Sequence, residues 1–159
     1  MKTFKYFLIA ALSVMTCTLL SSCKDDANDW DENTGGAPNR QWTPSSFTAV
    51  AGDTYINFNN FTISGATGYV IQVVAVDDLT TEPTDATWAN AKEKTVGKIG
   101  SEDIFKFDGL TPQTCYNLRL KAVSAGKMDS NWLILKKWSD TDNAWQYGVK
   151  TKAEGENAE

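Results

Sequence analysis

Few residue types in this chain could carry out chemistry. The 159 residues include no histidine, which is the commonest general base and the commonest metal ligand in proteins. The chain also contains no GxSxG, P-loop or CxxC pattern. We interpret the acidic pairs at 77–78 and 102–103 as solvated loop charges, and Asp140 and Asp142 as turn residues rather than as a calcium loop. We therefore expect a protein that is not an enzyme and that uses no metal or cofactor.

Cys23 is the residue with the most specific chemical prediction. Residues 1–22 have the build of a signal peptide, with Lys2 and Lys5 ahead of an apolar stretch that is too short and too diluted for a transmembrane helix. The letters LSSC at 20–23 resemble the bacterial lipobox, in which the cysteine becomes the lipidated first residue. A thiolate is a good nucleophile for accepting a diacylglyceryl group, and several acyl chains would hold the protein in a membrane. An ordinary signal peptide with an incidental cysteine is the alternative.

The residues after Cys23 predict a location. Lys24, Asp25 and Asp26 resemble the acidic export signal by which Gram-negative bacteria place lipoproteins on the outer face of the outer membrane. This resemblance implies a lipid-anchored protein of the outer membrane, exposed at the cell surface. A solvated acidic tether is the other interpretation of the same charges.

Charge and composition restrict the partners and the linker. Without residues 1–22 the chain has 13 basic and 20 acidic side chains, because the segment contains two lysines and no acid. Nucleic acid is therefore not an expected partner, since such binding needs a basic stripe. Residues 23–41 form the predicted acidic, disordered linker, and 154–159 a disordered tail. Cys115 is left without a disulfide partner, so the fold must depend on its core.

Residues 42–153 are predicted to form one all-β domain, because apolar residues alternate with polar ones between regularly spaced turns. The expected strands lie at 54–61, 68–76, 103–110, 115–123 and 145–151. A short helix at 86–94 is possible, although Val96 and Ile99 after it favour a strand. In the strand at 115–123, every second residue from Tyr116 to Ala122 is apolar and is expected to face the core.

One corner of this domain resembles a known family. Leu110, Pro112, Thr114 and Tyr116, followed by alternating apolar residues, are similar to the E–F corner and F strand of fibronectin type III domains. The resemblance implies an immunoglobulin-like β-sandwich of about seven strands. It also implies that the Tyr116 hydroxyl bonds the backbone a few residues upstream, so these four residues are structural.

The segment 125–137 and the tryptophans are the most individual features of the domain. This segment is long for a connection between strands F and G, and we expect either an extended hairpin or a binding loop. Trp88, Trp132 and Trp145 are the candidate ligand-binding residues, because flat aromatic faces suit sugar rings. Trp88 and Trp132 are expected to be exposed, and Trp138 to pack as in the family. Packing is the alternative for each tryptophan.

These observations favour a non-enzymatic binding or adhesion module that is anchored at the cell surface through Cys23. Its expected partners are the membrane, through the lipid anchor, and an extracellular glycan or protein. The alternative is a purely structural spacer or a subunit of an outer-membrane complex. That alternative predicts an exposed apolar patch on one sheet, for which Val70 and Val74 are the candidates.

Overall fold

The structure of the protein is a computed structural model that describes residues 39–158. The predicted signal peptide, the predicted lipidation site Cys23 and most of the predicted linker lie outside the described residues. Within residues 39–158, no helix has the length and apolar character needed to cross a membrane.

Ten strands and one short 3-10 helix make up the described chain. Their order is β1 (Thr48–Ala51), β2 (Tyr55–Asn59), β3 (Gly68–Val76), η2 (Asp85–Asn90), β4 (Lys92–Gly97), β5 (Phe105–Asp108), β6 (Cys115–Val123), β7 (Leu133–Ile134), β8 (Lys137–Ser139), β9 (Ala144–Gln146) and β10 (Gly148–Lys150). The sequence prediction placed strands at 54–61, 68–76, 103–110 and 115–123, and each of these ranges contains a strand. The single strand predicted at 145–151 is wrong, because this range is divided between β9 and β10, which belong to different sheets.

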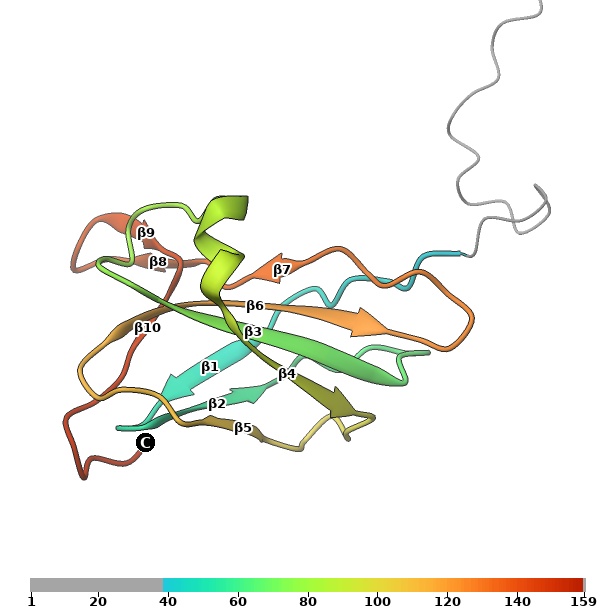
Figure 1. The fold of residues 1–159 in the computed structure, drawn as a ribbon, viewed down its shortest axis with the longest axis horizontal. Helices are drawn as coiled ribbons and strands as arrows, with labels where there is room; N and C mark the ends of the chain where they lie inside the picture. The colour runs from blue at the N-terminus through green and yellow to red at the C-terminus, as the bar shows by residue number, and fades with distance from the viewer. Residues whose placement is uncertain (1–38, 159) are drawn as a thin grey trace, which may run out of the picture. The chain divides into compact units, whose positions relative to one another are not determined.

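Strands β8 and β9 form a separate two-stranded sheet, and the remaining strands form two antiparallel sheets that face each other (Figure 1). One sheet has the order β1-β2-β5 and the other the order β10-β6-β3-β4, with β7 also pairing with β6. Because β7 and β10 share one edge of β6, the two sheets have seven strand positions. This division into a three-stranded and a four-stranded layer is that of immunoglobulin-like domains. The predicted all-β sandwich is confirmed.

The core lies between the sheets and follows from the predicted alternation. Aromatic rings from the three-stranded sheet meet aliphatic side chains from β3 and β6. The fully buried members include Ile56, Phe58, Phe61, Tyr69, Ile71, Val73, Phe107, Leu118, Leu120 and Ala122. Period two on one buried face is what an antiparallel sheet with one covered face requires. The strongest part of the sequence prediction was therefore the inward-facing rows.

The predicted alternation is wrong at the end of β3. Strict alternation along β3 would place Ala75 in the buried row of Tyr69, but Ala75 is exposed and its neighbour Val74 is buried. The 3-10 helix η2 packs against β3 and covers part of the outer face of this sheet (Figure 1). The apolar patch that Val74 suggested is therefore not exposed.

The corner around Tyr116 has the predicted structure. The Tyr116 hydroxyl accepts a hydrogen bond from the Thr111 backbone N–H at 2.9 Å, and the Thr114 hydroxyl donates to the Pro112 carbonyl at 3.0 Å. Leu110 is buried beneath the corner. Gln113 adopts a positive φ of 52°, a conformation typical of a tight turn. Tyr116 therefore has a structural role.

The long segment between strands F and G is an extended hairpin followed by an inserted hairpin. Residues 130–135 run back along β6, where Ser130 N–H bonds the Ala122 carbonyl and Leu135 N–H bonds the Leu118 carbonyl. The insertion then leaves the sheet as the β8–β9 hairpin, and β10 returns to pair with the start of β6. The additional length therefore interrupts the edge strand, rather than widening the loop after β6.

The domain includes residues that the sequence analysis assigned to the linker and the tail. Gln41 is almost fully buried, its amide donates to the Ser64 carbonyl, and it accepts a bond from the Ser124 hydroxyl. At the other end, Gly155 N–H bonds the Asp53 carboxylate and Ala158 N–H bonds the Tyr55 hydroxyl. A polar side chain can be buried at such a boundary because its hydrogen bonds are satisfied.

Candidate binding site

The most exposed aromatic pair of the described chain is on the β8–β9 hairpin. Trp138 and Trp145 are directly opposite each other on the two strands. Their ring centroids are 5.4 Å apart, with the rings near perpendicular at 77°. The two side chains are 42% and 45% exposed, and their rings contact each other in the T-shaped arrangement that aromatic pairs favour. The hairpin therefore presents about half of two large aromatic surfaces to solvent.

The hairpin is held in a defined conformation. The Asp142 carboxylate accepts hydrogen bonds from the Ser139 hydroxyl at 2.8 Å and from the Gln146 amide at 2.5 Å. Asn143 supplies the positive φ of the turn, which confirms that the acidic segment is a hairpin turn. The Lys136 ammonium lies 4.8 Å from the Trp145 ring centroid. These contacts fix the aromatic pair before any ligand arrives, which reduces the entropy lost on binding.

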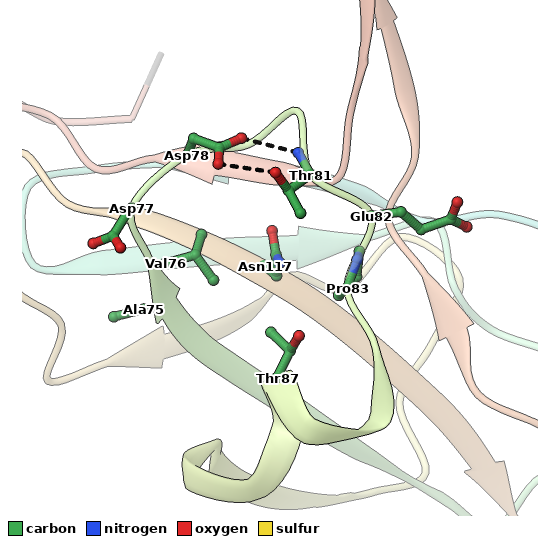
Figure 2. A pocket seen from close by; sticks show the side chains of 9 residues that line it. All are labelled: Ala75, Val76, Asp77, Asp78, Thr81, Glu82, Pro83, Thr87 and Asn117. Atoms are coloured by element: carbon green, nitrogen blue, oxygen red, sulfur yellow. Dashed lines mark hydrogen bonds between the residues drawn. The ribbon is translucent and has the colours of Figure 1, made fainter.

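A polar pocket lies beside the hairpin. It is about 340 Å³ in volume and lies between the end of β3, the loop before η2, Thr87 of η2 and Asn117 of β6 (Figure 2). The backbone N–H of Tyr147, the residue after β9, donates to the Leu79 carbonyl of the same loop at 2.8 Å. We call this hollow the Asn117 pocket. The hydrogen bond joins the hairpin to the loop that forms the pocket wall.

The Asn117 amide oxygen is the unsatisfied group of this pocket. Asn117 is 2% exposed, and its Oδ1 atom has no hydrogen-bond partner among the described residues. A buried acceptor without a partner costs roughly 1–3 kcal/mol, so such atoms are rare in folded proteins and call for an explanation. The amide stands on β6 beneath the loop (Figure 2). A donor that enters the pocket would recover this cost.

The loop above Asn117 is organised around a carboxylate. Asp78 accepts bonds from the hydroxyls and the backbone N–H groups of Thr80 and Thr81, at 2.7 to 3.0 Å. The hydrogen bond from the Thr80 hydroxyl has the largest effect on the pKa of Asp78, and together these hydrogen bonds lower that pKa to about 2. Asp78 is therefore charged at neutral pH. Three of the four bonds go to Oδ1, so Oδ2 has room for a further donor.

The two other predicted tryptophans form a stack on the outer face of the four-stranded sheet. The Arg119 guanidinium lies 4.3 Å from the Trp88 ring centroid and 4.2 Å from that of Trp132. Burial lowers the pKa of Arg119, while Asp85 and Glu93 act in the opposite direction.

The expectation that Trp88 is exposed is wrong, because Trp88 lies on the buried side of η2 and is only 6% exposed. Trp132 is half-buried. The structure therefore places these two rings in the stack and leaves Trp145, of the predicted set, on an open surface.

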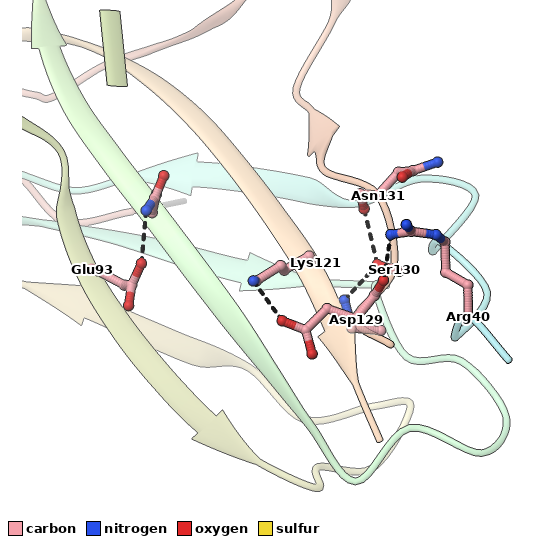
Figure 3. Close-up of polar contacts among 8 residues, drawn as sticks. Arg40, Glu93, Lys121, Asp129, Ser130 and Asn131 are labelled. Atoms are coloured by element: carbon pink, nitrogen blue, oxygen red, sulfur yellow. Dashed lines mark hydrogen bonds and ion pairs between the residues drawn. The ribbon is translucent and has the colours of Figure 1, made fainter. Parts of the chain in front are cut away.

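Polar contacts hold the chain just before Trp132, and Figure 3 shows those of Arg40, Lys121, Asp129 and Ser130. The Lys121 ammonium and the Asp129 carboxylate form an ion pair at 2.6 Å, and the Arg40 guanidinium donates to the Asp129 carbonyl at 2.8 Å. The buried Ser130 hydroxyl accepts the Ala122 backbone N–H at 2.8 Å. These contacts fix residues 129–132 against β6, so this segment is a packed edge of the sheet.

Two parts of the site were not predicted correctly from the sequence. Trp138 was expected to pack as in the family, but it is exposed against Trp145. Asn117 alternates with the core-facing row of β6, which would place it on the outer face in solvent, and its burial follows from the loop and η2 above it. In addition, residues 39–158 contain no group of three or more His, Cys, Asp or Glu side chains placed to hold a metal ion.

Comparisons with known proteins concern the fold alone. No protein-family model matches the chain, and no curated protein matches it significantly. Among solved structures, the chain is similar to the fn3 domain of human contactin 1, with 14% identity, a TM-score of 0.47, and coverage of 75% of this chain and 84% of that one. It is also similar to the FN5 domain of Drosophila Lar, with 18% identity, a TM-score of 0.46, and coverage of 74% and 99%.

The strand order and the tyrosine corner define the described chain as an immunoglobulin-like β-sandwich with the features of a fibronectin type III domain. This class of fold supports many functions, so the function has to be argued from the site.

Proposed function

We propose that this protein is a non-enzymatic carbohydrate-binding module, held at the outer surface of a bacterial cell by a lipid on Cys23. The exposed pair of Trp138 and Trp145 beside the Asn117 pocket is the observation on which the proposal depends. The lipid anchor rests on the lipobox at residues 20–23 and is independent of the sandwich.

The chemistry of the surface suits a sugar. The apolar face of a pyranose ring can be buried against an indole ring, and neighbouring polar groups then bind its hydroxyls. Trp145 supplies such a ring, and Asn117 supplies an acceptor that has no partner in the described chain. The Asp142 bonds keep the hairpin in place. Aromatic surface and hydrogen-bonding groups thus lie on adjoining segments of one end of the sandwich.

A purely structural role is less well supported. It predicted an apolar patch on the outer face of the four-stranded sheet, but Val74 is buried there and Val70 is half-buried. The edge strand β4 presents Lys92, Glu93 and Lys94, and such charges discourage pairing with a further strand.

The proposal is tested by affinity electrophoresis of residues 39–159 in gels that contain different polysaccharides, with tryptophan fluorescence as a second readout. Trp145→Ala should weaken binding at least about tenfold, which corresponds to ~1.4 kcal/mol. Trp42→Ala is the matched control, because Trp42 is 60% exposed and lies outside the hairpin. The two variants should have the same thermal stability within error.

Failure to retard the protein with any polysaccharide, or equal retardation of wild type and Trp145→Ala, would argue against a carbohydrate function. In that case an interaction of the aromatic pair with a protein becomes the stronger explanation. The lipid anchor is tested separately, because it does not depend on the ligand.

A further inference from the structure

The Asn117 pocket contains acceptors in excess of donors. The buried Asn117 Oδ1 atom has no partner among the described residues, and Asp78 Oδ2 receives a single hydrogen bond. Thr81 and Thr87 also line the pocket, and a hydroxyl can accept as well as donate. A ligand group that donates several hydrogen bonds at once therefore fits this set better than one that only accepts.

The charge around the pocket has one sign. Asp77, Asp78 and Glu82 line it, and no lysine or arginine is among the lining residues. The ion pairs found between residues 39 and 158 are Lys94–Asp108 and Lys121–Asp129, so these three carboxylates form none there. In Figure 2 the carboxylates of Asp77 and Glu82 lie at the edge and point away from the pocket. They contribute a negative potential rather than direct contacts, and this favours a cation.

The size and position of the pocket limit the ligand further. A volume of about 340 Å³ is at the small end for ligand pockets, which suits a single ring or side chain. Val76 and Pro83 supply an apolar part of the wall, against which a carbon skeleton can pack. The hydrogen bond between Tyr147 and Leu79 places the pocket next to the tryptophan hairpin. The hairpin and the wall of the pocket are therefore directly joined.

We propose that the Asn117 pocket binds a protonated primary amine of an amino sugar, with the ammonium donating to Asn117 Oδ1 and Asp78 Oδ2. This inference rests on the proposed carbohydrate function, whose aromatic surface takes the neighbouring ring of the same glycan. An acetylated amine has lost its charge and two of its three N–H donors, so it satisfies fewer of the acceptors. An acidic sugar is repelled by the carboxylates at the edge. The module is thus selective for glycans that contain free amines.

Isothermal titration calorimetry with short glucosamine oligomers tests this selectivity, with the fully N-acetylated oligomers of equal length as the comparison. Both are measured at a mildly acidic pH, where the free amine is charged. Wild-type residues 39–159 should prefer the free amine at least about tenfold. Glu82→Gln should reduce this preference without affecting folding, because the side chain is exposed. Glu102→Gln is the matched control, since Glu102 is an exposed acid outside the pocket.

Asn117→Leu removes the acceptor while nearly conserving the volume, and it should abolish most of the preference. Because Asn117 is buried, the circular dichroism spectrum and thermal transition of the Asn117→Leu variant are compared with those of wild type. If this variant unfolds, Glu82→Gln still tests the proposal. Trp145→Ala should weaken both oligomers equally, which separates the pocket from the aromatic surface.

The possible results have distinct meanings. Equal affinity for the two oligomers, or a preference that survives Glu82→Gln and Asn117→Leu, overturns the amine site and leaves the carbohydrate function standing. Binding of neither oligomer together with no polysaccharide binding overturns both. A lysine-rich peptide that binds in an Asn117-dependent manner, while amino sugars do not, would overturn the amino-sugar proposal and assign the amine to a protein partner.

Discussion

Tyr116 shows how one side chain can fix a corner of the sandwich. Its ring is part of the core, and its hydroxyl accepts the Thr111 backbone N–H across the turn. The turn between them contains a residue with positive φ, so its backbone cannot form a regular ladder. The hydroxyl therefore supplies a partner that the sheet does not offer.

Replacing Tyr116 by Phe is expected to lower the free energy of unfolding by about 0.5–1.5 kcal/mol, because one hydrogen bond is lost and the ring is kept. Tyr116→Ala removes the ring as well and should cost about 3–5 kcal/mol, the range for large aromatic truncations. Urea denaturation followed by fluorescence measures both changes. A Phe variant as stable as wild type would show that the corner bond contributes nothing.

Gly148 is required by the close approach of two strands. A Cβ atom at this position would lie 1.9 Å from the Tyr116 carbonyl oxygen, well inside van der Waals contact. Gly148→Ala must therefore push β10 away from β6, and we expect a loss of about 1–3 kcal/mol in the free energy of unfolding. Gly97→Ala is the matched control, because a Cβ there meets nothing within 4 Å. Comparable losses in the two variants would contradict this explanation.

The β8–β9 hairpin and the loop before η2 illustrate how elements outside the two sheets create a surface. Neither belongs to the seven strand positions, and the Tyr147 to Leu79 hydrogen bond ties them together. Asp142 orders the turn of one, and Asp78 orders the other. In these segments, local hydrogen bonds to carboxylates thus take the place of the backbone hydrogen bonds that hold a strand in a sheet.

The order of the loop before η2 should depend on pH through Asp78. Its pKa is lowered from 3.8 to about 2 in the folded state, so the charged form is stabilised by folding. The resulting stability is fully present above about pH 4 and is lost as the pH falls toward 2. Carboxyl chemical shifts measured by NMR should give a midpoint near pH 2. Thr80→Ala removes the largest influence and should raise the midpoint toward 3.8.

A wild-type midpoint at 3.8 would mean that the threonine hydrogen bonds do not form in solution. The pocket wall would then be unfixed, and the ligand would have to order it on binding.

At the scale of the whole molecule, the stability of the sandwich and its proposed attachment to a membrane depend on different residues. The core supports the fold without a disulfide in the described chain, because Cys115 is free there. The proposed anchor depends on Cys23, which lies outside the described residues. In this proposal, the location of the domain at a membrane follows from chemistry at one residue.

The anchor makes a direct prediction. Mass spectrometry of the mature protein from a Gram-negative host should find an acylated amino terminus at Cys23, and the protein should partition into the detergent phase. Cys23→Ser should lose the lipid and release the protein from membranes, because a hydroxyl does not replace the thiolate in this reaction. The β-sandwich of the variant should be as stable as that of wild type. An unmodified amino terminus in wild-type protein would disprove the lipid anchor.

Local periodicity was sufficient to predict the inward-facing rows of β2, β6 and most of β3. The alternation in 54–61, 68–76 and 115–123 indicated two-layer packing, and the residues from Leu110 to Tyr116 predicted the corner bond. These features depend on residues close together in the chain, so the sequence can reveal them. The hairpin turn containing Asp142 was predictable for the same reason.

The site depends on contacts between segments that are far apart in the chain. Trp88 is buried because η2 folds over β3, and Asn117 is buried because the loop before η2 covers the outer row of β6. Trp138 is exposed because the insertion lifts its hairpin away from the sheet. Whether a residue is buried depends on the segments that pack over it. The alternation within one strand contains no information about a covering segment from elsewhere in the chain. The tertiary structure therefore assigned these three residues their roles.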